Sequence, residues 1–262
     1  MSELIGKWAI VTGASSGLGT DFAEILAERG ANLVLVARRK DRLEALAMRL
    51  EQERGIDARV IAIDLGEPTA PQALFDELAA AGIDVDVLVN NAGFGVYGPF
   101  IDADWERERQ MLELNVVALT HLTKLFVRGM VARNHGWILQ VASIGAYQPS
   151  PMYGAYSATK AYVLSFGEAL AFELRNTGVK VSVLSPGVTK TEFFAASGQT
   201  PNLYQRLSMA ASRSVAEAGI RAMLRGKPSH VPGLLNQLPI QMLRLTPRRL
   251  QTRVANLLMS MK

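Results

Sequence analysis

Short apolar runs alternate along the chain with segments of helical spacing. Each run is nearly continuous in apolar residues, which is typical of strands buried on both faces of a parallel sheet. Between the runs, apolar residues recur every three or four positions, as at Phe22, Ile25 and Leu26, which predicts helices that bury one face. The six predicted strands span residues 7–12, 32–37, 58–63, 85–89, 136–141 and 179–184.

Strands that alternate with helices form βαβ units, whose crossovers are right-handed in nearly all proteins. The pattern therefore predicts an α/β domain over residues 1–232, with a doubly wound parallel sheet of the Rossmann type. Residues 191–214 follow the sixth strand and form a largely polar segment that includes Phe193 and Phe194. Two interpretations of this segment remain open, a mobile flap over a site and a helical excursion.

Residues 233–262 form a predicted amphipathic C-terminal extension of this single domain. Thr246 and Pro247 have the pattern of an N-cap followed by the first residue of a helix. The extension either packs on the body or across a subunit interface, or lies in a membrane interface with its cations toward anionic lipid. Arg248, Arg249 and Arg253 lie largely off its apolar positions, which are Leu234, Leu235, Leu238, Ile240, Met242, Leu243, Leu245, Leu250, Val254, Leu257, Leu258 and Met261.

Composition narrows the class of protein. The chain has 262 residues, of which 49% are hydrophobic and 20% charged, so it can bury a sizeable core and is too apolar for a disordered chain. It has no cysteine, which excludes a disulfide framework, a thiolate metal site and a cysteine nucleophile. Its three histidines are scattered without ligand spacing, so no metal site is expected.

No apolar run approaches the roughly 18–20 residues that span a bilayer, and the N-terminus lacks the features of a signal peptide. We therefore expect a cytoplasmic protein, with membrane association only through the C-terminal extension.

Charge is distributed unevenly along the chain. The net charge is +4, but residues 205–262 contain ten Lys or Arg and one acid, Glu217, so they carry +9 and the remainder carries −5. The basic region lacks the interleaved aromatic residues of a single-strand reader, and no DNA-reading motif is visible. No nucleic acid partner is expected.

A glycine-rich turn, TGASSGLG at residues 12–19, follows the first strand and opens a helix near Leu18. In a doubly wound sheet this turn lies at the carboxyl edge of the strands, where ligands bind. Glycines there allow close approach of a pyrophosphate, and the helix N-terminus supplies free N–H groups. The turn predicts a dinucleotide site; the alternative is that its glycines serve packing only.

Several separated motifs share a known pattern: TGASSGLG, NNAG at 90–93, Asn115, Ser143, the Tyr156-x3-Lys160 pair, and Pro186-Gly187 with Thr191. Over about residues 7–232 the chain resembles the short-chain dehydrogenase/reductase family, with its TGxxxGxG and YxxxK motifs. The resemblance implies an oxidoreductase that moves a hydride between a nicotinamide cofactor and a small-molecule carbonyl or alcohol. It assigns catalysis to Asn115, Ser143, Tyr156 and Lys160.

The residue types of this tetrad suit the reaction. Tyr156 and Lys160 share a helix face, and an ammonium about 4–5 Å away lowers a tyrosine pKa from its usual value near 10, which makes an acid–base catalyst. Ser143 ends the fifth strand, where its hydroxyl could stabilise an oxyanion. Asn115 is a polar residue in an apolar helical stripe, and the resemblance implies that it kinks the helix and holds a water that passes protons to Lys160.

The cofactor is expected to be NADP(H). An NAD enzyme places an acid at the end of the second strand, but this chain has none before Asp41 and carries Arg38 and Arg39 there instead. A guanidinium suits the 2′-phosphate, with Arg38 as the first candidate. Motif and resemblance together predict cofactor contacts at Gly13, Ser15, Ser16, Gly17, Leu18, Gly19, Arg38, Arg39, Asp64, Leu65, Asn91, Ala92, Gly93, Tyr156, Lys160, Pro186, Gly187, Val188 and Thr191.

Two other functions use part of this pattern. Sugar-nucleotide epimerases also carry a YxxxK pair, but they resemble longer proteins with TGxxGxxG spacing. A non-catalytic NADP-binding regulator would be expected to lose the tyrosine or the lysine. Apolar residues in or beside the loops favour an apolar carbonyl substrate: Phe94, Val96, Tyr97, Phe100, Tyr147, Phe193 and Phe194.

A homodimer or homotetramer is also expected. The resemblance implies pairing through the helices that carry Asn115 and Tyr156, and a helix that is apolar on more than one side needs a second partner. The additional apolar positions are Val116, Val117, Leu119, Ala161, Val163, Leu164 and Ala169.

Overall fold

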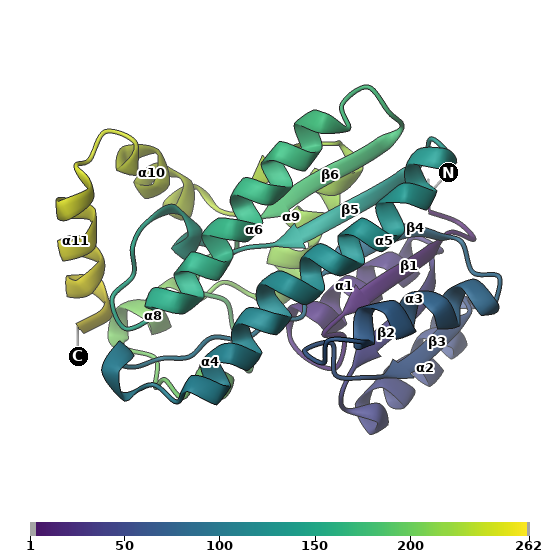
Figure 1. The fold of residues 1–262 in the computed structure, drawn as a ribbon, viewed down its shortest axis with the longest axis horizontal. Coiled ribbons are helices and arrows are strands. Elements are labelled where there is room, and N and C mark those ends of the chain that lie inside the picture. The colour runs from purple at the N-terminus through teal and green to yellow at the C-terminus, as the bar shows by residue number, and fades with distance from the viewer. Residues whose placement is uncertain (1–3, 261–262) are drawn as a thin grey trace.

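The computed structural model describes residues 4–260. Its core is a parallel sheet of seven strands in the order β3-β2-β1-β4-β5-β6-β7 (Figure 1). The order reverses next to β1, so the predicted doubly wound α/β fold is confirmed. The strands are β1 (Trp8–Thr12), β2 (Asn32–Ala37), β3 (Ala58–Ala62), β4 (Val85–Asn90), β5 (Gly136–Val141), β6 (Val179–Leu184) and β7 (Ser229–His230).

The six predicted strands match the observed bounds within one residue. The seventh, β7, was not predicted, because two residues are too short to give a pattern. It pairs with the end of β6, where Val183 and Leu184 face Ser229 and His230.

Helices cover both faces of the sheet. On one face α1 (Leu18–Glu28), α2 (Lys40–Arg54) and α9 (Ser212–Leu224) bury an apolar cluster that includes Phe22 and Ile220. On the other face α3 (Ala70–Ala80), α5 (Leu119–Ala132) and α6 (Gly154–Glu173) cover a second cluster. The carboxyl ends of the strands remain open between these two layers.

The helix that precedes β5 is distorted at Asn115. α4 (Trp105–Leu112) continues into η2 (Glu113–Ala118), a π-helical turn, and then into α5. The buried Asn115 side chain donates to the Phe94 carbonyl at 2.9 Å and to Thr159 Oγ1 at 3.1 Å. Its Oδ1 accepts from the Phe94 N–H at 3.2 Å. This amide therefore ties the helix to the loop after β4 and to α6.

The joined helix Trp105–Ala132 is long and apolar enough to cross a membrane, with a mean hydropathy of 1.2 over an 18-residue window. The sequence contains no continuous apolar run of this length, as expected; the helix qualifies because a window average tolerates the polar residues that interrupt its apolar runs. In this fold Leu122, Phe126 and Met130 of the helix are buried against the sheet. These apolar side chains of the helix are part of the hydrophobic core.

Short helices occupy the open edge of the sheet. They are η1 (Phe100–Asp102), η3 (Ile144–Tyr147), α7 (Phe193–Ser197) and α8 (Leu203–Ser208). The segment 191–214 thus contains two helical excursions. It is anchored by Tyr153, whose hydroxyl lies 2.7 Å from Gln199 Oε1 and 3.0 Å from Ser197 Oγ.

The chain ends in α10 (Leu234–Leu243) and α11 (Arg248–Ser260), which stand at one end of the molecule (Figure 1). α11 begins one residue later than predicted, and Thr246 is not its N-cap. The Thr246 hydroxyl instead donates to the Met242 carbonyl, at the end of α10, at 2.8 Å. Met261, the last predicted apolar position, lies outside the described residues, as does the side chain of Leu258.

Candidate active site

A cavity of about 620 Å³ lies at the carboxyl edge of the sheet. Its walls come from the loops after β1, β2, β3, β4, β5 and β6, which are brought together at this edge. All the predicted site residues line it except Gly19 and Asn115, which lie directly behind its wall. The volume falls within the range of roughly 300–1,000 Å³ that is usual for ligand pockets.

The glycine-rich turn forms one wall. Gly13 and Gly17 have φ angles of 69° and 54°, a left-handed conformation that favours glycine. A Cβ at Gly17 would lie 3.0 Å from Thr191, across the cavity. A Cβ at Gly19 would lie 2.0 Å from the Gly13 carbonyl oxygen, so this glycine serves the packing of the turn itself. Gly19 thus has a packing role, whereas the left-handed Gly13 and Gly17 leave the cavity side of the turn free of side chains.

Thr12 and Asn91 fix the ends of β1 and β4 beside that turn. Thr12 Oγ1 accepts from the N–H groups of Asn91 and Ala92, each at 2.9 Å. The Asn91 side chain donates back to the Thr12 carbonyl at 2.8 Å. The two loops that carry the cofactor motifs are thereby held in one arrangement.

Arginines gather at the end of the cavity next to β2. Arg39 Nε donates to Ser15 Oγ at 3.1 Å, and its Nη1 lies 2.8 Å from Glu192 Oε2. Glu192 also pairs with Arg42 at 2.8 Å, and the two arginines lower the pKa of its carboxyl to about 2. Arg38 is freer: its side chain is 73% exposed and makes a longer contact, 3.4 Å, with Asp64.

Ser143, Tyr156 and Lys160 meet at the opposite end. Ser143 follows β5, accepts the Gly145 N–H at 3.1 Å and lines the cavity together with Tyr156. Lys160, one turn after Tyr156 on α6, lies with its Nζ 5.9 Å from the centre of the tyrosine ring. Lys160 Nζ donates to the Val141 carbonyl at 2.9 Å. A hydroxyl donor, an acid and a cation therefore converge on one part of the cavity.

Similarity to known proteins identifies the family of this chain. The family model of the short chain dehydrogenases matches residues 7–202. The chain belongs to the short-chain dehydrogenase family. It is 32% identical over 191 residues to a 7beta-hydroxysteroid dehydrogenase of Collinsella aerofaciens. The aligned region covers 73% of this chain and 72% of that protein.

Two solved structures have the same fold as this short-chain dehydrogenase. One, from a study of 7beta-hydroxysteroid dehydrogenase stereoselectivity, superimposes with a TM-score of 0.87 and 27% identity over 97% of this chain and 98% of that one. Another, a short-chain dehydrogenase from Sphingobium yanoikuyae in complex with NADPH, has a TM-score of 0.81 and 30% identity over 91% and 94%. The protein is an oxidoreductase of the hydride-transfer type that uses a nucleotide cofactor.

Burial governs the pKa values of Tyr156 and Lys160 in this dehydrogenase. Desolvation raises the pKa of Tyr156, and the Ser143 hydroxyl only partly opposes this rise. Desolvation also lowers the pKa of Lys160 to about 8. The expectation of a tyrosine pKa below 10 is wrong, because burial disfavours the charged phenolate and raises the pKa of Tyr156.

Aromatic side chains line the same end of the cavity in this dehydrogenase. Of the seven apolar residues expected near the substrate, Phe94, Phe193 and Phe194 are part of the lining and the other four are not. Phe100, for example, is exposed, and the Tyr147 hydroxyl points to Ser185 and Ser229.

Tyr153 was missed from the sequence. Its ring lies 5.5 Å from that of Tyr156, and it lines the cavity beside Phe193. Its place three residues before Tyr156, one helical turn, was the signal that could have found it. Arg107 also lines the cavity unpredicted, with its guanidinium 5.6 Å from the centre of the Phe94 ring.

Proposed function

We propose that this dehydrogenase reduces apolar carbonyl compounds reversibly with NADPH. The observation that carries the proposal is the position of Ser143, Tyr156 and Lys160 at one end of a cavity whose other end holds Arg38 and Arg39. The aromatic lining favours an apolar substrate. Among the relatives, the hydroxysteroid dehydrogenase supports an apolar substrate and the NADPH complex supports the choice of cofactor.

The residues present fit a dinucleotide with a 2′-phosphate. Gly13 and Gly17 leave room for a pyrophosphate at the N-terminus of α1, where the N-cap Gly17 has no side chain to satisfy the first N–H groups. Arg38 and Arg39 supply cations where an NAD enzyme would carry an acid. Thr191 and the turn at Pro186 and Gly187 would hold the nicotinamide end.

Each catalytic side chain then has a separate task. When bound, the cofactor supplies the hydride that reduces the carbonyl carbon. Ser143 Oγ donates a hydrogen bond to the carbonyl oxygen and orients it. Tyr156 transfers its hydroxyl proton to that oxygen, and the charge of Lys160 stabilises the phenolate that remains.

Activity should depend on the protonation of Lys160. Burial favours the neutral amine and lowers its pKa to about 8, so the charge that stabilises the Tyr156 phenolate is present below that pH and lost above it. We expect kcat/KM for carbonyl reduction to fall as the pH rises through about 8. Steady-state rates from neutral to alkaline pH measure this. A Lys160→Met variant should show low activity without that inflection, and a wild-type profile that is flat across this range contradicts the assignment.

We also propose that the protein forms homodimers or homotetramers through the outer faces of α5 and α6. Two residues expected there, Leu119 and Val163, are buried within the chain against Ala142 and Val183 and cannot contribute. Of the expected positions, Val117, on the turn η2 that leads into α5, is 52% exposed; Tyr162 of α6, which was not expected, is 40% exposed. Light scattering at micromolar concentration should give a multiple of 28.5 kDa, and a mass equal to one chain contradicts the proposal.

A further inference from the structure

The helix α10 is apolar on two opposite sides. Ile240 is buried and packs toward the body, whereas Leu234, Leu238 and Met242 are well exposed. At about 100° per residue these three lie on the side of the helix opposite Ile240, together with Leu235, which is 88% exposed. Packing on the body accounts for one side only, so the other side requires a second partner.

The next helix, α11, continues this surface and adds positive charge. Gln251 and Ala255 are buried, and Leu250 and Val254 form an exposed stripe beside them. The helical period places Arg249 and Arg253 along the outer border of that stripe. We call this surface the tail face, defined by Leu234, Leu235, Leu238, Met242, Leu250 and Val254 with Arg249 and Arg253 at its border.

The chain places no acid near the tail face within its own segment. After Glu217 the sequence contains no Asp or Glu. The face therefore combines exposed leucines with uncompensated arginines. This combination matches an anionic lipid surface, into which the apolar side chains insert while the cations meet the headgroups.

The inner side of α10, opposite the tail face, adjoins the active site. The Asn236 side chain on α10 packs on the turn after β6 so closely that a Cβ at Gly187 would lie 2.5 Å from it. α10 also packs against η3, the turn that follows Ser143. Figure 1 places α10 and α11 at the same end of the molecule as α4 and α8, which flank the open edge of the sheet.

We propose that the tail face docks this dehydrogenase on anionic membranes, with the mouth of its cavity beside the bilayer. Apolar carbonyl substrates would then enter from the lipid; this second part rests on the proposed function, whereas the docking does not. A second copy of the chain fits less well. In a two-fold contact the same patch meets itself, so the four arginines of two tail faces would share one interface to which the tail segments bring no acid.

The test is sedimentation of the full-length protein with vesicles at low salt. One set contains equal parts phosphatidylcholine and phosphatidylglycerol, and the other contains phosphatidylcholine alone. The wild type should sediment with the anionic vesicles, and less of it should sediment as salt is added. With the neutral vesicles it should stay in the supernatant. Arg249→Gln with Arg253→Gln should weaken binding about thirtyfold, since each basic residue near such a surface contributes about fivefold. Leu238→Gln with Met242→Gln should abolish it.

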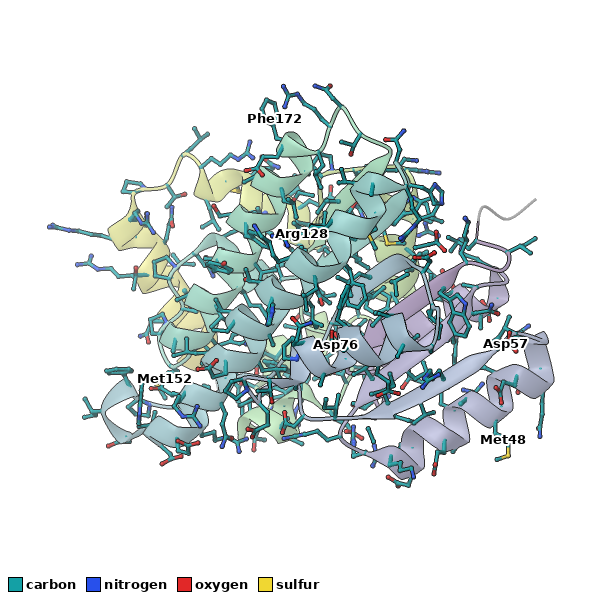
Figure 2. All side chains as sticks on the ribbon, turned by 45° about the vertical axis from the view of Figure 1, so that its right-hand side comes forward. Met48, Asp57, Asp76, Arg128, Met152 and Phe172 are labelled. Carbon is teal, nitrogen blue, oxygen red and sulfur yellow. The ribbon has the colours of Figure 1, made fainter. Side chains whose placement is uncertain are left out.

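Matched variants elsewhere control for charge and hydrophobicity. Arg49→Gln with Arg54→Gln removes two cations from α2, whose side chains are 44% and 40% exposed, and Ile5→Gln with Met48→Gln removes two exposed apolar side chains. Met48 of α2 lies on the side of the molecule away from the tail helices (Figure 2). Both control pairs should bind vesicles like the wild type.

Two results overturn docking: the wild type ignores anionic vesicles at low salt, or the Leu238 and Met242 pair changes the mass in light scattering but not vesicle binding. The second result would make the face a subunit contact. Reduction of a water-soluble carbonyl by every variant reports the proposed function separately. With a ketone dissolved in anionic vesicles, the Arg249 and Arg253 pair should be slower than the wild type, and equal rates overturn access from the lipid.

Discussion

Replacement of Tyr156 by phenylalanine should lower the turnover of carbonyl reduction by roughly 10²–10⁴, the usual contribution of a general acid. Phenylalanine keeps the ring that packs 5.3 Å from Phe193 but removes the proton that the carbonyl oxygen must receive. NADPH affinity should change little, because the glycine-rich turn and Arg38 are untouched. The steady-state rate of NADPH oxidation with the best available ketone measures the effect.

Tyr153→Phe is the matched control for this experiment. Tyr153 lies on the same side of the cavity, but its hydroxyl is bonded to Ser197 and Gln199 and burial raises its pKa to about 12. Its loss should alter substrate affinity or the anchoring of α7 and leave most of the turnover. If Tyr156→Phe turned over like the wild type, or if Tyr153→Phe were the more damaged variant, the role assigned to Tyr156 would be wrong.

The second large effect concerns the cofactor. Arg38→Asp should weaken the binding of NADPH by about 10–100-fold, the range expected when a charged hydrogen bond is lost. The affinity for NADH should stay nearly unchanged. Arg38 is the better target of the two arginines, since Arg39 is held by Ser15 and Glu192 whereas Arg38 has only its long contact with Asp64. Fluorescence titration of both cofactors gives the two dissociation constants.

Arg59→Asp controls for the change in charge. Arg59 is also a partly exposed arginine paired with a carboxylate, Glu77 at 3.0 Å, but it does not line the cavity. This variant should bind NADPH like the wild type. Equal affinity of the wild type for NADPH and NADH contradicts the assignment of Arg38 to the 2′-phosphate.

The sheet was predictable because its strands are buried on both faces. Strands such as β4 and β5 are buried along their whole length, and such runs are visible without any tertiary information. β7 has two half-buried residues and depends on β6 for its existence, so no local pattern marks it. The glycine-rich turn was found for a similar reason, because its backbone geometry restricts the residue type at Gly13 and Gly17.

Properties that depend on packing were harder to predict. The spacing of Tyr156 and Lys160 placed them on one helix face, but the direction of the tyrosine pKa depends on how much water the surrounding chain removes. Likewise Leu119 and Val163 looked available for a partner until β5 and β6 covered them. Phe100 lies in a loop near the site, yet its side chain points to solvent. Residue type and spacing do not determine these outcomes.

Transfer of a labelled hydride tests the central claim most directly. The purified protein is incubated with an apolar ketone and NADPH that carries deuterium at the reactive position of the nicotinamide, and the product is examined by mass spectrometry. The proposed function predicts an alcohol with one deuterium on the former carbonyl carbon, formed by the wild type and almost absent with Tyr156→Phe. Tight NADPH binding with no labelled alcohol from any ketone tried would contradict the claim and favour a regulator that binds the cofactor without turnover.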